Sequence, residues 1–253
     1  MGMAITVFTV HEIKPGDRQT DGQKDRQRSG NINWASNPKL PEIYNYLKSV
    51  AAADSNSCTL KSIGKTAHRK DIMMLKLSNG NPSNEAFLVE AGLHGREWAA
   101  VLSVLYFIEH IAWNFTKQPD YIKNKDWYII PVVNPEGYEY SMTKNRLWRK
   151  NRRTFSGPCD GVDLNRNFDT NWGTRDSSNN ICAETFCGPQ PFSEQETIAI
   201  RGVTQGSVIG PKLYLHQMFN SAFKAYVTLH ISRADYYNTN NNTETEVEIT
   251  SYS

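Results

Sequence analysis

The chain has 253 residues, a length that suits one large domain or two small ones. It carries 28 Lys and Arg against 26 Asp and Glu, and a net charge of +2 argues against nucleic acid or an anionic membrane as the main partner. With 39% apolar residues and 12 Tyr, 10 Phe and 6 Trp, a fully disordered chain is excluded. No window approaches about 18 uninterrupted apolar residues, so no bilayer-spanning helix is predicted.

The two ends of the chain differ in composition from its middle. Residues 16–30 include no apolar residue and mix both charge signs, so residues 1–30 are expected to form a solvated leader. The opening MGMAITVFTV has no basic segment before its apolar run, and no signal peptide is visible. Residues 233–253 are polar and lack a core pattern. We therefore expect a leader (1–30), a folded part (31–232) and a divergent tail (233–253).

The first half of the folded part is predicted to hold two helices and two strands. Apolar residues at helical spacing over residues 40–50, after the capping residue Asn37, predict a helix. Residues 72–77 and 86–91 are short apolar runs separated by the turn-forming SNGNPSN, and they predict two neighbouring strands. Residues 97–115 are apolar and free of Gly and Pro, which predicts a buried helix.

The second half continues this alternation. Residues 127–133 predict a third strand that Asn134-Pro135 stops, and residues 156–188, rich in Gly, Asn and Asp, predict long loops that build a site. Ser193, with Glu196 three residues later, is a capping-box signal for a further helix. Two strand-like runs follow, at residues 212–215 and 225–230. Strands that alternate with helices favour an α/β sheet with helices on its faces.

The cysteine pattern leaves the redox state open. Four cysteines are too few for a disulfide scaffold, and they lack the C-x-x-C spacing of a structural zinc site. One bridge, two bridges or four free thiols are all compatible with this pattern.

The sharpest local motif is GLHGREW, at residues 92–98, just past a predicted strand. His94 and Glu97 are three residues apart, close enough for an imidazole and a carboxylate to bind one metal ion. A surface His beside a Glu at a helix N-terminus has the same spacing. Zinc also needs a third protein ligand and an open position.

Two arginine-containing motifs follow. Six of the ten residues from Lys144 to Arg153 are basic, which is typical of a solvated basic loop or of a nucleic-acid-binding patch. In GVDLNRNFD, Arg166 stands between two asparagines in a Gly-bounded loop. That arrangement is suited to binding a carboxylate through two parallel hydrogen bonds.

Together these motifs resemble those of the zinc carboxypeptidases of the pancreatic A/B type, including insect digestive relatives. The similarity extends from about residue 31 to about residue 230. The motifs stand in the order of the family, namely LHGREW, NPEGYEYS, NRLWRK, CDGVDLNRNFD, CAET and PFSE.

The resemblance implies a fold, a cofactor and a substrate. The fold is α/β, with a mixed β-sheet and helices on both faces, and is expected to be incomplete at the C-terminus. One zinc ion per chain and peptide or protein C-termini as substrates are implied. The protein is expected to be an extracellular monomer without a nucleic-acid or membrane partner. The family's bridge would pair Cys159 with Cys182 and leave the other two cysteines unpaired.

The same resemblance implies three zinc ligands, His94, Glu97 and His230. His230 ends the run FKAYVTLH, which is similar to the family's strand before its last ligand. His216 also ends a strand-like run, KLYLH, and is the rival third ligand. The residues immediately before His230 match better, so we favour His230.

Substrate contacts are implied residue by residue. Arg149, the second Arg of NRLWRK, resembles the arginine that stabilises the oxyanion, and Arg146 would stand beside it. Asn165 and Arg166 resemble the clamp for the terminal carboxylate of the substrate. Arg96 corresponds to an arginine that contacts residues further up the peptide. In this combination a metal polarises the scissile carbonyl while a clamp selects a free C-terminus.

The resemblance breaks after His230. The family there reads Ser-Tyr, and its general-base Glu and closing Tyr come later, whereas this chain continues with Ile231-Ser232 and a polar tail. We therefore expect a family member truncated at its C-terminus, whose hydrolysis of peptides is impaired. The alternatives are a non-catalytic pseudo-enzyme that binds zinc or peptide, and a partial gene product. A basic nucleic-acid binder is disfavoured by the charge balance.

Overall fold

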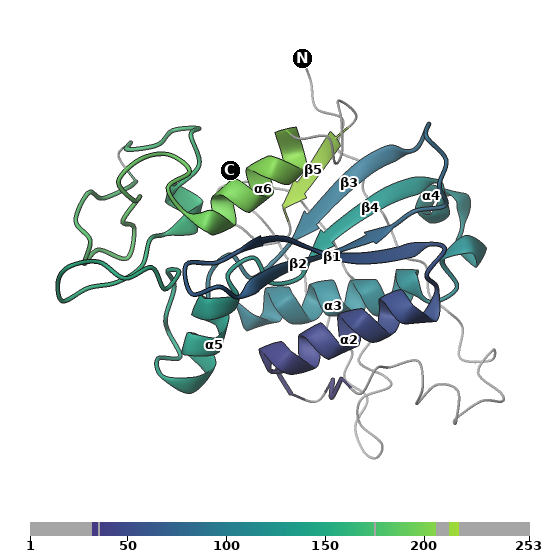
Figure 1. The fold of residues 1–253 in the computed structure, drawn as a ribbon, viewed down its shortest axis with the longest axis horizontal. Coiled ribbons are helices and arrows are strands. Elements are labelled where there is room, and N and C mark those ends of the chain that lie inside the picture. The colour runs from purple at the N-terminus through teal and green to yellow at the C-terminus, as the bar shows by residue number, and fades with distance from the viewer. Residues whose placement is uncertain (1–31, 35, 175, 206–212, 218–253) are drawn as a thin grey trace, which may run out of the picture.

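A computed structural model of the chain describes residues 32–34, 36–174, 176–205 and 213–217. Its centre is a five-stranded sheet with the order β1-β2-β4-β3-β5 (Figure 1). The strands are β1 (Cys58–Lys65), β2 (Asp71–Leu77), β3 (Glu85–Glu90), β4 (Lys125–Ile130) and β5 (Leu213–Gln217).

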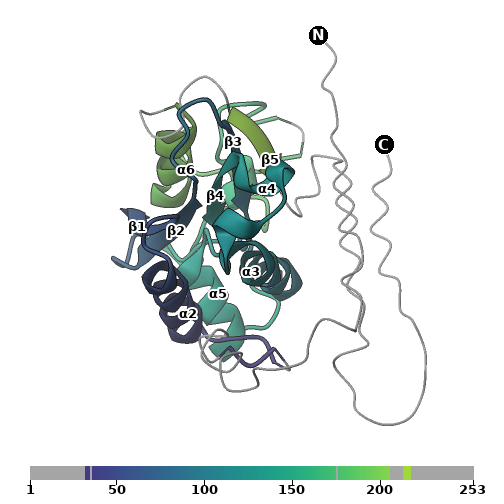
Figure 2. The ribbon, with the colours of Figure 1, turned by 90° about the vertical axis from the view of Figure 1, so that its right-hand side faces the viewer.

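Helices cover both faces of this sheet. Figures 1 and 2 place α2, α3 and α5 against one face and α6 against the other. The helices are α2 (Leu40–Ala53), α3 (Trp98–Ala112), α4 (Asp120–Lys123), α5 (Pro135–Thr143) and α6 (Gln195–Gln205), with the short 3-10 helices η2 (Phe115–Lys117) and η3 (Leu164–Arg166). The predicted α/β class is thus confirmed.

The sheet is mixed, and its parallel part positions the site. β1 pairs with β2 and β2 with β4 in antiparallel fashion, whereas β3 runs parallel to both β4 and β5. The two strands predicted as neighbours, β2 and β3, are separated by β4, so that expectation was wrong. Since parallel strands end at the same edge, the segments that follow β3 and β4 meet there.

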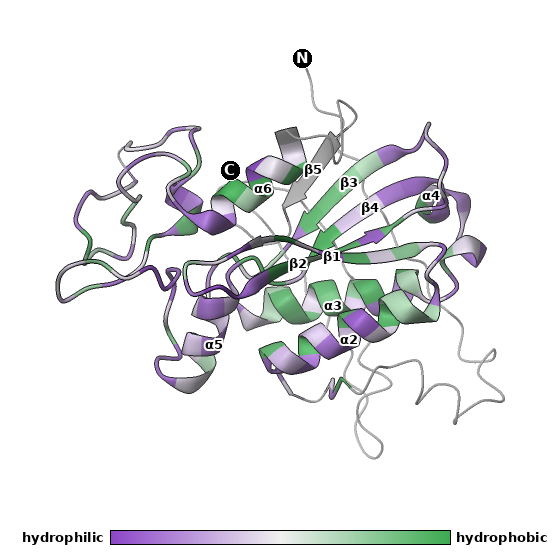
Figure 3. Ribbon diagram, viewed as in Figure 1, coloured by the Kyte–Doolittle hydropathy of each residue, from purple (hydrophilic) through white to green (hydrophobic). Residues whose placement is uncertain are grey.

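Two apolar clusters hold the layers together. On one face, α3 buries Val101, Val104, Leu105 and Ile108, whose spacing of three and four residues forms one helical stripe. Figure 3 shows α3 as a largely hydrophobic helix beside the more mixed α2. On the other face, α6 packs Ala199, Ile200 and Val203 against the sheet. Each fully buried aliphatic side chain contributes about 1.5–3 kcal/mol relative to exposure.

Three predicted helices need corrections at their ends, and the first is α2, whose N-cap is Lys39 and not the predicted Asn37. The helix expected over 97–115 ends at Ala112, and Asn114, with a left-handed φ of 57°, separates it from η2. The helix expected from the capping box begins only at Gln195, because Ser193 Oγ donates to the side chain of Glu194 instead of capping the helix. Helix α5 and strand β1 were not predicted.

Several expectations lie outside the described residues. They are the leader (1–30), the strand at 225–230 with His230, and the tail (233–253). Within the described part of the chain, no helix is long and apolar enough to cross a membrane.

Candidate active site

The candidate site lies just past the ends of β3 and β4. Backbone hydrogen bonds continue the ladder beyond both strands, from Ala91 N to Ile130 O (3.0 Å), from Val133 N to Ala91 O (2.9 Å) and from Asn134 N to Gly92 O (2.9 Å). The two segments therefore run side by side up to the turn that contains His94.

Glycine is required in this turn by close approach. A Cβ atom on Gly95 would lie 2.3 Å from the carbonyl oxygen of Gly137 on α5, far inside van der Waals contact. The Gly95 amide donates to Arg149 O (3.0 Å), and the Gly95 carbonyl accepts from Ser141 Oγ (2.7 Å). The turn is thus fixed against α5 and against the arginine segment at once.

His94 and Glu97 face each other across this turn. His94 is buried, and its Nδ1 lies 2.7 Å from Glu97 Oε1. The other ring nitrogen, Nε2, lies 3.0 Å from Asp163 Oδ1. Since Asp163 engages Nε2, the nitrogen left facing Glu97 is Nδ1. A carboxylate behind the imidazole fixes the orientation of the ring in this way at many metal sites.

Asp163 joins the imidazole to the arginine segment. Its side chain is fully buried, and its second oxygen, Oδ2, accepts from Arg149 Nε (3.0 Å). Burial alone would raise the pKa of Asp163, but hydrogen bonds and charges from His94 and Arg149 outweigh it and hold the pKa below its usual range. Asp163 was absent from the residues predicted for the site.

The pKa of His94 shifts in the opposite direction to that of Asp163. Burial opposes the protonation of His94, but Asp163 and Glu97 outweigh burial and raise its pKa. In the metal-free site the two carboxylates thus stabilise an imidazolium. A cation between His94 Nδ1 and Glu97 would replace that proton, because metal binding requires the neutral ring.

A buried asparagine ties three segments behind this arrangement. Asn134 Nδ2 donates to the carbonyls of Leu93 (3.2 Å) and Lys150 (3.1 Å), and its Oδ1 accepts from the Gly137 amide (2.8 Å) at the start of α5. The sequence signal was the Asn-Pro pair, which also fits an N-cap followed by Pro at the first helical position.

The basic segment 144–153 has most of its charges paired within the protein, whereas Lys144 and Arg146 are exposed. A simple solvated loop is excluded, because Asn151 is buried and four cationic residues have partners within the protein. These four are Arg149 on Asp163, Lys150 on the carbonyl of Ile181, Arg152 over the rings of Tyr140 and Trp148, and Arg153 on Glu194.

Arg96 and Arg146 lie together at the rim of the turn. Arg146 Nη1 donates to Arg96 O (2.9 Å), and its guanidinium lies 3.6 Å from the ring centroid of Trp98. Arg96 Nη1 donates to Leu147 O (3.1 Å) and forms an ion pair with Glu184 Oε2 (2.9 Å). Glu184 was not predicted for the site, although it lies in the CAET motif at residues 182–185.

Asn165 and Arg166 lie on η3, immediately after Asp163. The backbone amides of both residues donate to Asp163, from Asn165 N to Oδ1 (3.1 Å) and from Arg166 N to the carbonyl (2.9 Å). Arg166 Nε donates to the carbonyl of Asp176 (2.8 Å), and its side chain is partly exposed. The predicted clamp is thus attached to the same buried aspartate as His94 and Arg149.

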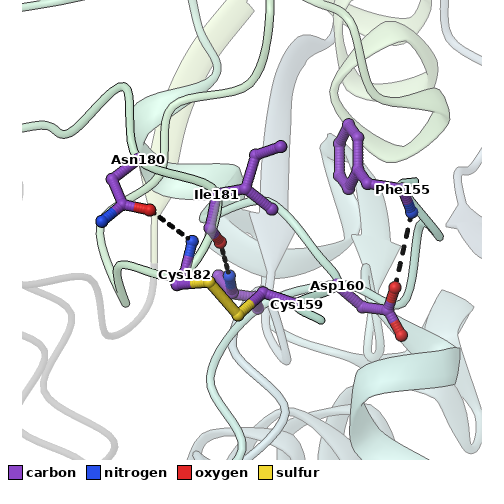
Figure 4. The surroundings of a disulfide bond; sticks show 7 residues. Phe155, Cys159, Asp160, Asn180, Ile181 and Cys182 are labelled. Carbon is purple, nitrogen blue, oxygen red and sulfur yellow. Dashed lines mark hydrogen bonds between the residues drawn. A yellow bond between two sulfur atoms is a disulfide. The ribbon is translucent and has the colours of Figure 1, made fainter. Parts of the chain in front are cut away.

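A disulfide anchors the loop opposite this segment. Cys159 and Cys182 are bonded, with a sulfur–sulfur distance of 2.06 Å (Figure 4), and the buried Cys58 and Cys187 are free. Beside the bridge, the buried Lys150 donates from Nζ to Ile181 O (2.7 Å). Burial lowers the pKa of Lys150.

His94 and Glu97 fit two positions of a zinc site. Imidazole nitrogen and carboxylate oxygen are common zinc ligands, and His94 Nδ1 and Glu97 Oε1 lie 2.7 Å apart. Among the described residues, no group of three His, Cys, Asp or Glu side chains could hold a metal. The favoured third ligand, His230, lies outside these residues, whereas the backbone of His216 lies on β5 opposite Val89 of β3.

The chain is similar in sequence to known proteins. A family model described as zinc carboxypeptidase matches residues 43–248. Zinc carboxypeptidase A 1 of Drosophila melanogaster is 34% identical over 209 residues, which cover 79% of this chain and 48% of the relative. Carboxypeptidase B of Rattus norvegicus is 31% identical over 207 residues, which cover 80% of this chain and 47% of the relative. The chain thus spans about half the length of the curated relatives it matches.

Solved structures share the fold. Carboxypeptidase A from Helicoverpa armigera aligns with a TM-score of 0.65 at 37% identity, covering 70% of this chain and 44% of that one. Thrombin activatable fibrinolysis inhibitor (TAFI) aligns with a TM-score of 0.68 at 29% identity, covering 78% of this chain and 53% of that one. Because the family model extends over most of the sequence, the chain belongs to the zinc carboxypeptidase family.

Proposed function

We propose that this chain carries the zinc-binding part of an exopeptidase that removes the C-terminal residue of peptides. The observation that carries the proposal is the connected set His94, Glu97, Asp163 and Arg149, in which one buried carboxylate orients both an imidazole and a guanidinium. A zinc ion bound to His94 and Glu97 would supply Lewis acidity toward a carbonyl and acidify a bound water.

The protein's own residues would bind and orient the substrate. Arg149 is held by Asp163 with only 12% of its side chain exposed, so its remaining guanidinium donors are positioned to meet negative charge that develops on the scissile carbonyl. Arg166, with Asn165, would bind the terminal carboxylate of the peptide, which makes a free C-terminus the recognised feature. Arg96 and Arg146 would contact residues further up the peptide.

We propose His230 as the third ligand, on the match of its preceding residues to the family's strand. The position of His216 supports the rival assignment, because β5 runs parallel to β3 and ends at the edge where His94 follows β3. Titration of zinc into the single alanine variants of the two histidines decides between them. Loss of zinc in His216→Ala alone would contradict the assignment of His230, and the exposed His110→Ala serves as the control.

Peptide turnover by the chain of 253 residues is proposed to be slow. No Glu after His230 stands in the sequence context of the family's general base, and general acid–base help is typically worth about 10²- to 10⁴-fold. The alternative is a zinc- or peptide-binding protein without catalysis. Assays with C-terminal aromatic and basic peptides separate the two, since the alternative predicts binding and no release of the last residue.

Peptide C-termini are the proposed partners, and the protein is proposed to act as an extracellular monomer. The bond between Cys159 and Cys182 supports an oxidising compartment, where such bridges persist. A zinc carboxypeptidase relative, bovine thrombin-activatable fibrinolysis inhibitor, has been solved in complex with tick carboxypeptidase inhibitor. A protein inhibitor of that kind is therefore a reasonable probe of the site.

The decisive experiment measures recognition of the terminal carboxylate. Labelled peptides with a free C-terminus should bind the zinc-loaded chain more tightly than the same peptides amidated at the C-terminus. Arg166→Ala should abolish this preference, at a cost of about 1.5–3 kcal/mol for the lost charged hydrogen bonds. Arg69→Ala, an exposed arginine on the turn between β1 and β2, should leave it unchanged. Equal affinity for free and amidated peptides in the unsubstituted chain would overturn the proposal.

A further inference from the structure

Three buried carboxylates that the proposed chemistry does not use gather behind the site. Glu194 and Glu196 lie at the start of α6, and Glu136 lies in the first turn of α5. All three are at least 95% buried. Asn151, which is fully buried, lies between the two glutamates of the α6 start and donates from Nδ2 to Glu194 Oε2 (2.8 Å) and to Glu196 Oε2 (3.2 Å).

The three acids differ in their partners. Glu194 accepts from the guanidinium of Arg153 at Nη1 (2.8 Å). Glu136 Oε1 accepts from the hydroxyl of Thr66 and from the backbone amide of His68, and Glu136 Oε2 lies 3.1 Å from His68 Nδ1. Glu196 has the neutral Asn151 amide as a partner, while its Oε1 atom has no hydrogen-bond partner among the described residues. A buried carboxylate without a cation favours its protonated form.

The titration of Glu196 follows from these surroundings. Burial raises its pKa to about 7, and the charges of Glu194 and Glu136 add to the rise, while hydrogen bonds from its own backbone amide and from Asn151 oppose it. The groups that face Glu196 are thus Glu136 from α5, Glu194 before α6 and the Asn151 amide. Arg153 and His68 stand one step further out, on Glu194 and Glu136.

Asn151 connects this acid to the candidate site. Its side-chain Oδ1 accepts from the backbone amide of Val162 (2.8 Å), and its backbone amide donates to Val162 O (3.0 Å). Val162 directly precedes Asp163, and Arg149 precedes Asn151 by two residues. The ion pair between Arg149 and Asp163 therefore lies just beyond the two hydrogen bonds that Asn151 makes to Val162.

We propose that Glu196 is a positioning residue: it holds the side-chain amide of Asn151, and Asn151 holds the Arg149 segment against the segment of Asp163. Ionisation of Glu196 would strengthen the hydrogen bond that it accepts from Asn151 and would add repulsion from the neighbouring Glu194. The Asn151 side chain and its bond to Val162 would then shift above neutral pH, and with them the environment of Arg149. The proposal rests on the proposed function only for the role of Arg149.

Nuclear magnetic resonance of the metal-free, ¹⁵N-labelled chain tests this between about pH 5.5 and 8.5. The Asn151 side-chain amide and the Val162 backbone amide should titrate with a common midpoint near 7, and the Arg149 Nε–H signal should follow. In Glu196→Gln, which stays neutral at every pH, these signals should remain at their low-pH positions. The control variant is Glu139→Gln, in which the partly exposed partner of Lys70 loses its charge, and the midpoint should stay the same.

Two results would overturn the proposal. One is a titration of Val162 and Asn151 that persists in Glu196→Gln, and the other is its absence in the unsubstituted chain. Should Glu196→Gln fail to fold, Glu136→Gln supplies the second variant, because removal of that neighbouring charge should move the midpoint to lower pH. None of these measurements requires zinc or peptide turnover, so their failure would leave the proposed function standing.

Discussion

Two regions of this protein are held together by different kinds of interaction. The sheet, α2 and α3 pack together through aliphatic and aromatic side chains, and the buried face of α3 is apolar. The segments from 144 to 194 instead depend on buried polar side chains such as Asn151, Asp163 and Asn167. The first kind of packing tolerates small rearrangements, whereas buried hydrogen bonds fix geometry because each unmatched group carries a full desolvation cost.

The candidate site lies mainly in the polar region and is attached to the apolar region through the turn of His94. The turn of His94 emerges from the apolar sheet, but its partners Asp163 and Arg149 come from the polar segments. A catalytic constellation gains from this division, since an apolar layer supplies stability and polar ties supply precise orientation. Substitutions in the two regions test this division.

Leu105→Ala should have the largest effect. Leu105 is fully buried in α3, and truncation of such a residue leaves a cavity that lowers the free energy of unfolding by about 2–5 kcal/mol. Chemical denaturation followed by circular dichroism measures the loss. Leu147→Ala is the matched control, because its side chain is largely exposed and the same truncation should change stability by less than about 0.5 kcal/mol.

Asn167→Ala should cost about 2 kcal/mol, through unmatched polar groups. Asn167 Nδ2 donates to Cys187 O and to Ser193 Oγ, and its Oδ1 accepts from Thr197 Oγ1. Limited proteolysis should show cleavage within 156–194 before the sheet unfolds. Asn145→Ala, at an exposed asparagine, is the control. Equal sensitivity of this variant to protease would show that the polar region does not depend on the hydrogen bonds of the buried Asn167.

Acid should weaken the metal-free site through Asp163. Its pKa is held low by His94 and Arg149 in the folded chain, so its contribution is present above the unfolded value of 3.8 and is lost as pH falls through the folded value. Asp163→Asn should therefore lower the free energy of unfolding by about 1.5 kcal/mol at pH 5. The fall of the unfolding free energy with decreasing pH should also be less steep in this variant. Denaturation curves between about pH 2.5 and 5 measure it, and the exposed Asp169→Asn should keep the original slope.

Glu184→Gln should have the smallest effect on stability. Its side chain is 60% exposed and pairs with the partly exposed Arg96, and such a pair contributes about 0–1 kcal/mol. The unfolding free energy should change by less than about 1 kcal/mol, and high salt should erase the difference. A loss as large as that of Asn167→Ala would show that the rim is part of the polar framework.

The apolar region could be predicted largely from periodicity. The apolar stripe of α2 and α3 and the runs of β2, β3 and β4 predict their elements, because burial on one or both faces leaves a pattern in the sequence. Strand β1 leaves a weaker one, since Lys61 and Ser62 lie exposed on this edge strand. Helix α5 was missed because Asn134-Pro135 reads equally as the end of a strand and as the start of a helix.

The polar region could be predicted only in part. Motif spacing indicated His94 and Glu97, and the family resemblance indicated Arg149. The roles of Asp163 and Asn151 arise instead from contacts between segments distant in the sequence. No local pattern distinguishes a buried asparagine that bridges two segments from an asparagine in a turn. The order of strands in the sheet is likewise a property of pairing across the chain, which periodicity does not encode.

The close approach at Gly95 has a consequence for redesign of this protein. A methyl group there would collide with the backbone of α5, which cannot withdraw as a flexible side chain could. Combinatorial libraries should therefore hold position 95 constant and vary Arg96, Arg146 and Glu184, whose side chains are exposed or partly exposed at the rim. The same contact restricts sequence variation: side chains at the rim can change while the backbone that presents His94 stays fixed.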